Sequence, residues 1–253
     1  MKVKTLIWLC LIWAVTVQCD SEDAIDCLQT QGQIITQEIQ VGAFNSIRIE
    51  DGVRLVVKQG ETQEVLITTG ENLLPDVEVL LEDSTLVIKN NNNCNVFRDY
   101  GITTATVTAV NLEEIRNSSR FEVRSQGNLE FPRMRLLSNT NGAGSSGKKS
   151  GDFYLSLTTN NLRISANGVS VFYLDGFATN ADIIFSDEQP RLEGEALLID
   201  NITVLQTSAN TMIINPQLSL TGEIRGTGDI ISKNRPEVVD VSLLFTGRLI
   251  FED

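Results

Sequence analysis

Short runs in which apolar and polar residues alternate dominate residues 43–90. Such runs occupy residues 46–50, 53–58, 64–68, 77–81 and 85–89. A period of two is that of a β-strand with one buried face. Asp51-Gly52, between the first two runs, is typical of a two-residue hairpin turn. No window of the chain combines helical spacing of apolar residues with helix caps, so the pattern predicts an all-β fold with a hairpin-rich segment at 43–90.

Residues 112–233 carry a different pattern, in which an aliphatic residue, a group of small polar residues and a further alternating run recur. This unit occurs at residues 114–123, 136–142, 162–171, 205–214 and 223–231, with a further candidate at 183–189. The spacing is roughly 20 residues, the chain length of one coil in a β-solenoid.

The small residues have a physical explanation in such a stack. We expect them at corners where neighbouring coils approach closely, because Gly and Asn tolerate unusual backbone angles. Asn and Ser side chains can also form hydrogen-bonded ladders between coils. The expected fold is therefore a β-solenoid or β-helix-like stack, and an antiparallel sandwich with turns rich in Ser and Asn is the alternative.

The N-terminal residues predict export. A basic start, residues 1–4, precedes an apolar run at residues 6–17. This arrangement is that of a secretory signal peptide, and the run is too short to span a membrane. We therefore divide the chain into a signal peptide at 1–18, an acidic tether at 19–33 and one β domain at 34–253.

The four cysteines separate by position. Cys10 lies within the leader, and Cys19 follows it in a context that resembles a bacterial lipoprotein signal, which makes Cys19 the candidate lipidation site. Gln18 departs from the small residue usual before such a cysteine, so cleavage by the ordinary signal peptidase is the alternative. Cys27 and Cys94 are predicted to form a disulfide in an oxidising compartment, with two unpaired thiols as the alternative.

The charge balance limits the partners. The chain has 20 Lys and Arg against 33 Asp and Glu, a formal charge of −13, and removal of Lys2 and Lys4 with the leader makes it −15. Nucleic acid binding requires cations to neutralise phosphates, and anionic lipid headgroups repel an acidic surface. We predict no nucleic acid partner and a membrane link only through the N-terminal lipid.

The sequence offers little catalytic chemistry. The chain has no histidine, which excludes Ser-His and Cys-His nucleophiles, and it has no C-x-x-C metal motif. We predict no enzyme activity, no cofactor and no metal. A carbohydrate-active enzyme with paired carboxylates is the alternative, and its candidate residues are Asp175, Asp182, Asp187, Glu188, Asp200 and Asp229.

Aromatic residues mark one strand region at 171–177. Phe172 and Tyr173 are adjacent, so in a strand one of them faces outward. An exposed aromatic ring can stack on a sugar or anchor a protein contact, although a core position or a plug at a coil edge is the commoner role.

Residues 43–90, followed by the corners ISANG, SANT and RGTGDI, resemble the auto-transporter adhesin head domain called the GIN domain, which is common in exported Bacteroidetes proteins. The resemblance implies a β-helix-like fold and an adhesive or envelope role, and it supplies no catalytic residues. Asp20, Glu22 and Asp23 match the acidic residues that often follow the lipidated cysteine of surface lipoproteins in such bacteria.

We therefore predict an adhesin-like outer-membrane or cell-surface lipoprotein that binds a glycan or a cell-surface protein. A periplasmic or secreted location is the alternative address, and a purely structural envelope protein is a further alternative function. The sequence assigns neither the ligand nor the oligomeric state.

Overall fold

The computed structural model describes residues 29–92, 94, 99–141 and 147–252. Within these residues, strands β1 to β17 form one hydrogen-bonded sheet, with a single short 3-10 helix, η2 (Glu71–Asp76). The predicted signal peptide, Cys19 and Cys27 lie outside the described residues, so signal cleavage, lipidation and the Cys27–Cys94 disulfide stay predictions.

The strands fall into two groups by length. The strands before residue 140 are short: β1 (Ile34–Glu38), β2 (Ser46–Asp51), β3 (Arg54–Gln59), β4 (Glu64–Gly70), β5 (Val77–Glu82), β6 (Thr85–Asn90), β7 (Thr104–Ala109), β8 (Glu114–Ser118), β9 (Val123–Glu130) and β10 (Arg133–Ser138). Four long strands follow, and then three short ones: β11 (Phe153–Ala166), β12 (Val171–Phe185), β13 (Arg191–Gln206), β14 (Met212–Ile224), β15 (Ile230–Ser232), β16 (Val238–Leu243) and β17 (Leu249–Phe251).

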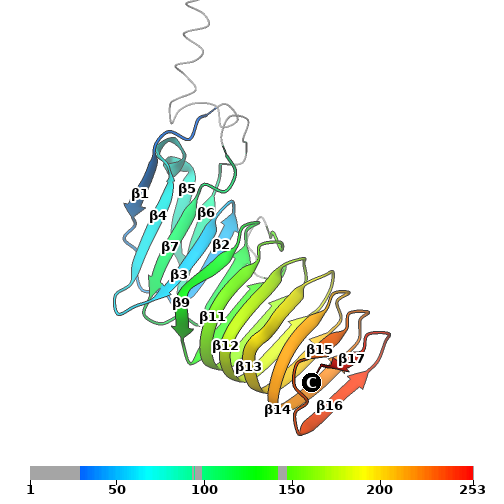
Figure 1. Ribbon diagram of the computed structural model, residues 1–253. Coiled ribbons are helices and arrows are strands. Elements are labelled where there is room, and N and C mark those ends of the chain that lie inside the picture. The colour runs from blue at the N-terminus through cyan, green and yellow to red at the C-terminus, as the bar shows by residue number, and fades with distance from the viewer. Residues whose placement is uncertain (1–28, 93, 95–98, 142–146, 253) are drawn as a thin grey trace, which may run out of the picture.

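The sheet consists of two sets of hydrogen-bonded neighbouring strands, which we call ladder A and ladder B. Ladder A contains β5, β6, β2, β8, β10, the C-terminal halves of β11 to β14, and β16. Ladder B contains β1, β4, β7, β3, β9, the N-terminal halves of β11 to β14, β15 and β17. Each long strand passes from one ladder to the other, so the whole is a single curled sheet whose strands lie side by side along the molecule (Figure 1).

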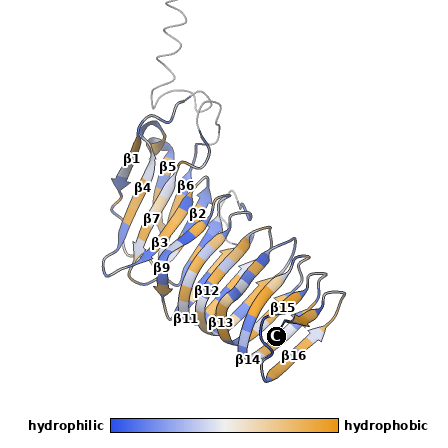
Figure 2. Cartoon of the chain, in the orientation of Figure 1, coloured by the Kyte–Doolittle hydropathy of each residue, from blue (hydrophilic) through white to orange (hydrophobic). Residues whose placement is uncertain are grey.

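The two inward faces share one hydrophobic core. In ladder A one continuous column contains Leu86, Ile47, Ile115, Leu136, Ile164, Ile183 and Val204. In ladder B the matching column contains Leu55, Val123, Phe153, Phe172, Leu192, Met212 and Ile230. All of these side chains are buried, and the alternation of apolar and polar residues appears as alternating colour along the strands (Figure 2). Stacking lets each narrow turn of chain bury apolar area that it could not cover alone.

The repeat predicted from the sequence is confirmed by strand register. Ala166, Phe185, Gln206, Ile224 and Leu243 occupy equivalent positions in successive parallel strands. The step between them is about 20 residues. The unit proposed at 183–189 takes its place in this series, because β12 lies between β11 and β13. The all-β class is thus confirmed, as one curled sheet and not as a clear solenoid. The predominance of parallel pairs excludes the antiparallel sandwich.

The corners of small polar residues also stack as expected. Between β13 and β14, the Ala209 backbone N–H donates to the Glu188 carbonyl of the preceding corner at 3.0 Å. The Gly228 N–H of the next corner donates to the Ser208 carbonyl at 3.0 Å. Backbones this close leave little room for larger side chains, which explains the run of Gly, Ala, Ser and Asn.

The hairpin predicted at Asp51-Gly52 is wrong. Strands β2 and β3 do not pair with each other: β2 pairs with β6 and β8, whereas β3 pairs with β7 and β9. Asp51 has a φ of 50°, and the turn sends the chain from ladder A to ladder B. The two-residue hairpin in this segment lies instead at Asp83-Ser84, where Glu82 and Thr85 are paired in antiparallel register.

The described end of the predicted tether contacts the β domain. Gln29 is buried, and its side-chain amide donates to the Asn72 carbonyl of η2 at 2.8 Å. Within residues 29–252, apart from the undescribed gaps, no helix is long and apolar enough to cross a membrane.

Candidate functional site

Two tyrosines stack on the outer face of ladder B. Tyr154 of β11 and Tyr173 of β12 are register partners, with ring centroids 4.6 Å apart and planes 6° from parallel. On the β9 side, the Arg124 guanidinium carbon lies 4.0 Å from the Tyr154 ring centroid. Because β11 lies between β9 and β12, Tyr154 is covered on both faces, whereas Tyr173, 39% exposed, offers the accessible ring.

The core holds this pair in place. Phe153 and Phe172, the neighbours of the two tyrosines in sequence, stack inward with centroids 4.6 Å apart. Both phenylalanines are fully buried, and the ring of Phe172 also stacks near that of Phe185, with centroids 5.9 Å apart. Strand alternation then forces Tyr154 and Tyr173 outward at the same level. The prediction that one of Phe172 and Tyr173 faces outward is confirmed.

Irregular backbone forms the two walls of a groove around the tyrosines. The β9–β11 register shifts between Tyr154 and Ser156, where β9 has extra residues around Gly127. The β12–β13 register shifts between Tyr173 and Gly176, and the β13–β14 register shifts between Glu193 and Leu198. The excess residues of β9 and β13 therefore flank a floor made by β11 and β12. Such bulges commonly lie beside functional sites, where they redirect side chains.

This groove, which we call the tyrosine groove, has a volume of about 560 Å³ and a polar rim. It is lined by Ser125, Gly127, Asn128, Tyr154, Leu155, Ser156, Tyr173, Leu174, Asp175, Glu193, Glu195 and Ala196. Carboxylates dominate its β12–β13 side, and hydroxyls and amides its β9 side. An aromatic floor with hydrogen-bonding groups around it suits a ligand that has both apolar faces and hydroxyl groups.

An ion-pair cluster fixes Arg124 over the ring. The Glu122 carboxylate lies 2.8 Å from Arg54 Nε and 3.5 Å from Arg124 Nε. Burial acts to raise the pKa of Glu122, but its own backbone N–H and the two arginines outweigh that effect and lower the pKa. Burial, together with the charge of Asp152, raises the pKa of Tyr154, which keeps this hydroxyl protonated and able to donate.

The six carboxylates considered for catalysis are dispersed. Only Asp175 lines the groove. Asp182 pairs with Arg163 at 2.8 Å and Asp229 with Arg248 at 2.7 Å. The others are distributed as follows: Asp187 and Glu188 are exposed in the corner after β12, and Asp200 is half-buried in β13.

Two further groove carboxylates were not candidates from the sequence. Glu193 is bonded to Arg191, and the side chain of Glu195 is 70% exposed. Their position depends on the register shifts of β13, and no sequence pattern revealed those shifts. Among the described residues, no group of three or more Cys, Asp and Glu side chains is placed to hold a metal ion.

Comparison with known proteins agrees with the fold. The family model described as "Putative auto-transporter adhesin, head GIN domain" matches residues 43–236. No curated protein sequence matches the chain.

Several solved structures are similar to the chain. One from Bacteroides fragilis, described as a putative adhesin, has 19% identity and a TM-score of 0.78, covering 88% of this chain and 99% of its own. Another, from Parabacteroides distasonis and described as a putative lipid binding protein, has 16% identity and a TM-score of 0.62, covering 88% of this chain and 98% of its own. At these identities the likeness concerns the fold alone.

Proposed function

The chain belongs to the family described as "Putative auto-transporter adhesin, head GIN domain", and we propose that it is a non-enzymatic, surface-displayed protein that binds a glycan in the tyrosine groove. The observation that carries the proposal is the stacked Tyr154–Tyr173 pair, of which one ring is accessible, between two walls of irregular backbone. Sugar rings have apolar C–H faces that pack on aromatic rings, and their hydroxyls bond to carboxylates and amides of the kind that line this groove.

The same contacts favour a neutral glycan. Asp175, Glu193 and Glu195 lie on the β12–β13 side of the groove, where an acidic sugar would meet like charge. Arg124 does not offset them, because it lies over Tyr154 and beside Glu122. Carboxylates accept hydrogen bonds from sugar hydroxyls without any change in charge.

Binding fits this groove better than hydrolysis does. A glycosidase needs one carboxyl group withdrawn from water as the general acid and a second one opposite it. Glu195 is largely exposed and Glu193 is engaged by Arg191. Glycan hydrolysis by the protein, abolished by Glu195→Gln, would favour the carbohydrate-active alternative.

Substitution of Tyr173 tests the proposal. On a glycan array followed by titration calorimetry, Tyr173→Ala should weaken binding of a neutral oligosaccharide by about tenfold, which corresponds to about 1.4 kcal/mol. The matched control is Phe177→Ala, because Phe177 lies on the same strand, is 36% exposed and does not line the groove. Equal losses in the two variants, or no neutral glycan bound by the parent protein, would reject the groove as the binding site.

We also propose that Cys19 carries the lipid that anchors the protein, and that the Cys27–Cys94 bridge ties the start of the mature chain to the β domain. The predicted repeat coils would then form a solenoid held at a short distance from the membrane, since Gln29 contacts η2 directly. Intact mass of the protein extracted from its native membrane tests both points. An acylated chain that begins at Cys19 is expected, with a gain of two hydrogens on reduction. An unmodified N-terminus at another residue would refute the anchor.

A further inference from the structure

Arginines gather on the outer face of ladder A, in a protein whose formal charge is −13. Arg133 and Arg135 of β10 and Arg163 of β11 line one groove of about 350 Å³. Arg135 and Arg163 are register partners on neighbouring strands, and each side chain is about half exposed. Like charges directly opposite each other destabilise a sheet, and here each arginine is offset by an acidic register partner on its other side, Glu114 for Arg135 and Asp182 for Arg163.

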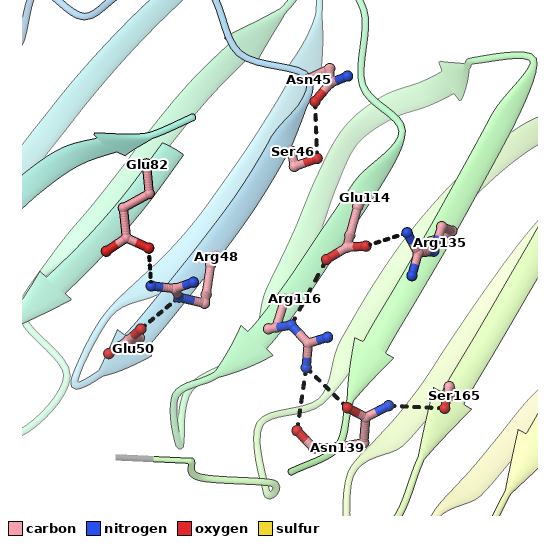
Figure 3. A network of polar contacts seen from close by, with 10 residues as sticks. All are labelled: Asn45, Ser46, Arg48, Glu50, Glu82, Glu114, Arg116, Arg135, Asn139 and Ser165. Atoms are coloured by element: carbon pink, nitrogen blue, oxygen red, sulfur yellow. Dashed lines mark hydrogen bonds and ion pairs between the residues drawn. The ribbon is translucent and has the colours of Figure 1, made fainter. Parts of the chain in front are cut away.

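The carboxylates nearby do not neutralise this group. Glu114 is shared: it lies 2.9 Å from Arg135 and 3.8 Å from Arg116 (Figure 3). Asp182 pairs with Arg163 at 2.8 Å. Within the described part of the chain, Arg133 forms no ion pair. Two carboxylates are thus shared among four arginines: Arg116, Arg133, Arg135 and Arg163.

The buried Arg116 supports the positive character of this face. Its guanidinium donates to the side-chain oxygen of Asn139 at 3.0 Å rather than to a second carboxylate. Burial lowers the pKa of Arg116, and the charges of Arg48 and Arg135 act in the same direction against the opposing effect of Glu114. Arg48 itself is held by Glu50 and Glu82, at 2.6 and 2.7 Å, further along the same ladder (Figure 3).

A row of amides extends from the arginines. Asn161, Asn180 and Asn201 are successive register partners, in line with Arg133, and all three line the groove. Asn201 donates to the Asn180 side-chain oxygen at 3.3 Å, and Ser219 donates to the Asn201 side-chain oxygen at 2.8 Å. The row is therefore an ordered ladder of polar groups next to the positive charges.

We propose that this arginine groove is a second binding site, specific for an oxyanion such as the sulfate, phosphate or carboxylate of a glycan or of a lipid headgroup. The planar fork of arginine matches the geometry of such groups in two parallel hydrogen bonds, and Arg133 is available for one. Amide N–H groups of the adjoining asparagine row would bond to hydroxyls beside the anion. The site lies on ladder A, whereas the tyrosine groove lies on ladder B, so the inference does not depend on the glycan proposal.

The net charge of the chain does not oppose this proposal. Exposed charges more than about 10 Å away are largely screened at physiological salt. The charge of the whole chain therefore argues against broad adsorption to an anionic surface, whereas an oxyanion inside the groove responds to the nearest arginines.

Titration of isotopically labelled protein with inorganic sulfate tests the site, with NMR signals of the arginine Nε–H groups as the readout. We expect saturable shifts that are weakened about tenfold by Arg133→Gln, since a hydrogen-bonded charge is lost. The control is Arg120→Gln, because Arg120 is also exposed, forms no ion pair within the described residues and lies outside the groove. Equal weakening in the two variants, or shifts that do not saturate, would overturn the proposal.

Two larger probes identify the source of the anion. A sulfated oligosaccharide and vesicles of phosphatidylglycerol are each compared with a neutral counterpart, an unsulfated oligosaccharide and phosphatidylcholine vesicles. Binding of one anionic probe that depends on Arg133 supports the site and assigns its source. Failure of both, or binding that Arg133→Gln leaves unchanged, overturns it. Because Tyr173→Ala leaves this face intact, it should not alter binding of either anionic probe.

Discussion

The same four long strands build both outer faces, yet their two halves differ in regularity. In ladder A, residues 161–166 of β11 continue in unbroken register with residues 180–185 of β12 and 201–206 of β13. In ladder B, the halves of these strands next to the tyrosines show register shifts at the β9–β11, β12–β13 and β13–β14 pairs. Regular pairing thus lies beside irregular pairing within single strands.

The contrast indicates how a recessed site arises on a stacked sheet. Phe153, Phe172, Leu192 and Met212 keep an unbroken inward column, and the shifts begin only after it. The core therefore supports the irregular backbone, and extra residues can project outward without a cavity beneath them. In ladder A the register is unbroken, so that face presents ordered rows of side chains, such as the asparagine row beside Arg133.

Gly176 is the position in the irregular half of these strands where a substitution should destabilise the protein most. Its φ is +112°, and a Cβ there would lie 2.1 Å from the Leu157 carbonyl oxygen of the neighbouring strand. Gly176→Ala should cost about 3 kcal/mol of unfolding free energy, because both the backbone angle and the contact oppose a side chain. Urea unfolding measures this loss.

Gly127, in the β9 wall of the groove, is the matched control. It also has a positive φ, +86°, but a Cβ there would meet nothing within 4 Å. Gly127→Ala should cost only about 1 kcal/mol, the effect of the backbone angle alone. Similar losses at the two positions would mean that the contact with the Leu157 carbonyl oxygen adds nothing to the cost of a side chain at Gly176.

Local sequence patterns predicted the repeating part of this molecule well. Alternation predicted the strands, and the recurrence of small polar residues predicted the step between them. This works because each corner packs closely on the next and therefore requires small residues at the same place. At the site, alternation alone required either Phe172 or Tyr173 to face outward. The neighbours of Tyr173 were not predictable in this way, since Tyr154 stacks on Tyr173, and Arg124 on Tyr154, through register between separate strands.

Turn chemistry was a weaker guide than periodicity. Asp51-Gly52 has the better hairpin sequence, yet it forms a corner between ladders, whereas Asp83-Ser84 closes a hairpin. Asp51 and Asp83 have nearly the same φ, 50° and 54°. Strand pairing therefore depends on what the following strand buries: the buried side chains of β3 complete the ladder B column, and those of β6 complete the ladder A column.

Burial of single charged groups gives the smallest predicted effect. Ladder A buries both Glu50 and Arg116. In ladder B, Asp152 lies directly before β11, is partly buried, and its carboxylate accepts the Val171 N–H at 2.8 Å. Burial raises the pKa of Asp152, and the charge of Glu122 raises it further against the opposing hydrogen bond from Val171. A raised pKa in the folded state favours the protonated acid, so stability from this group is present below about pH 4 and lost as the pH rises through the folded-state value.

Asp152→Asn removes that dependence, because asparagine stays neutral and its oxygen can still accept the Val171 N–H. We expect the variant to gain up to about 1 kcal/mol relative to the parent protein as the pH rises from about 3 to about 7, measured by urea unfolding at each pH. Asp229→Asn is the control of opposite sign, because the hydrogen bond from Arg248 lowers the pKa of Asp229 despite some burial. That variant should lose relative stability over the same interval. A shared sign for the two variants would contradict the view that burial dominates at Asp152 and ion pairing at Asp229.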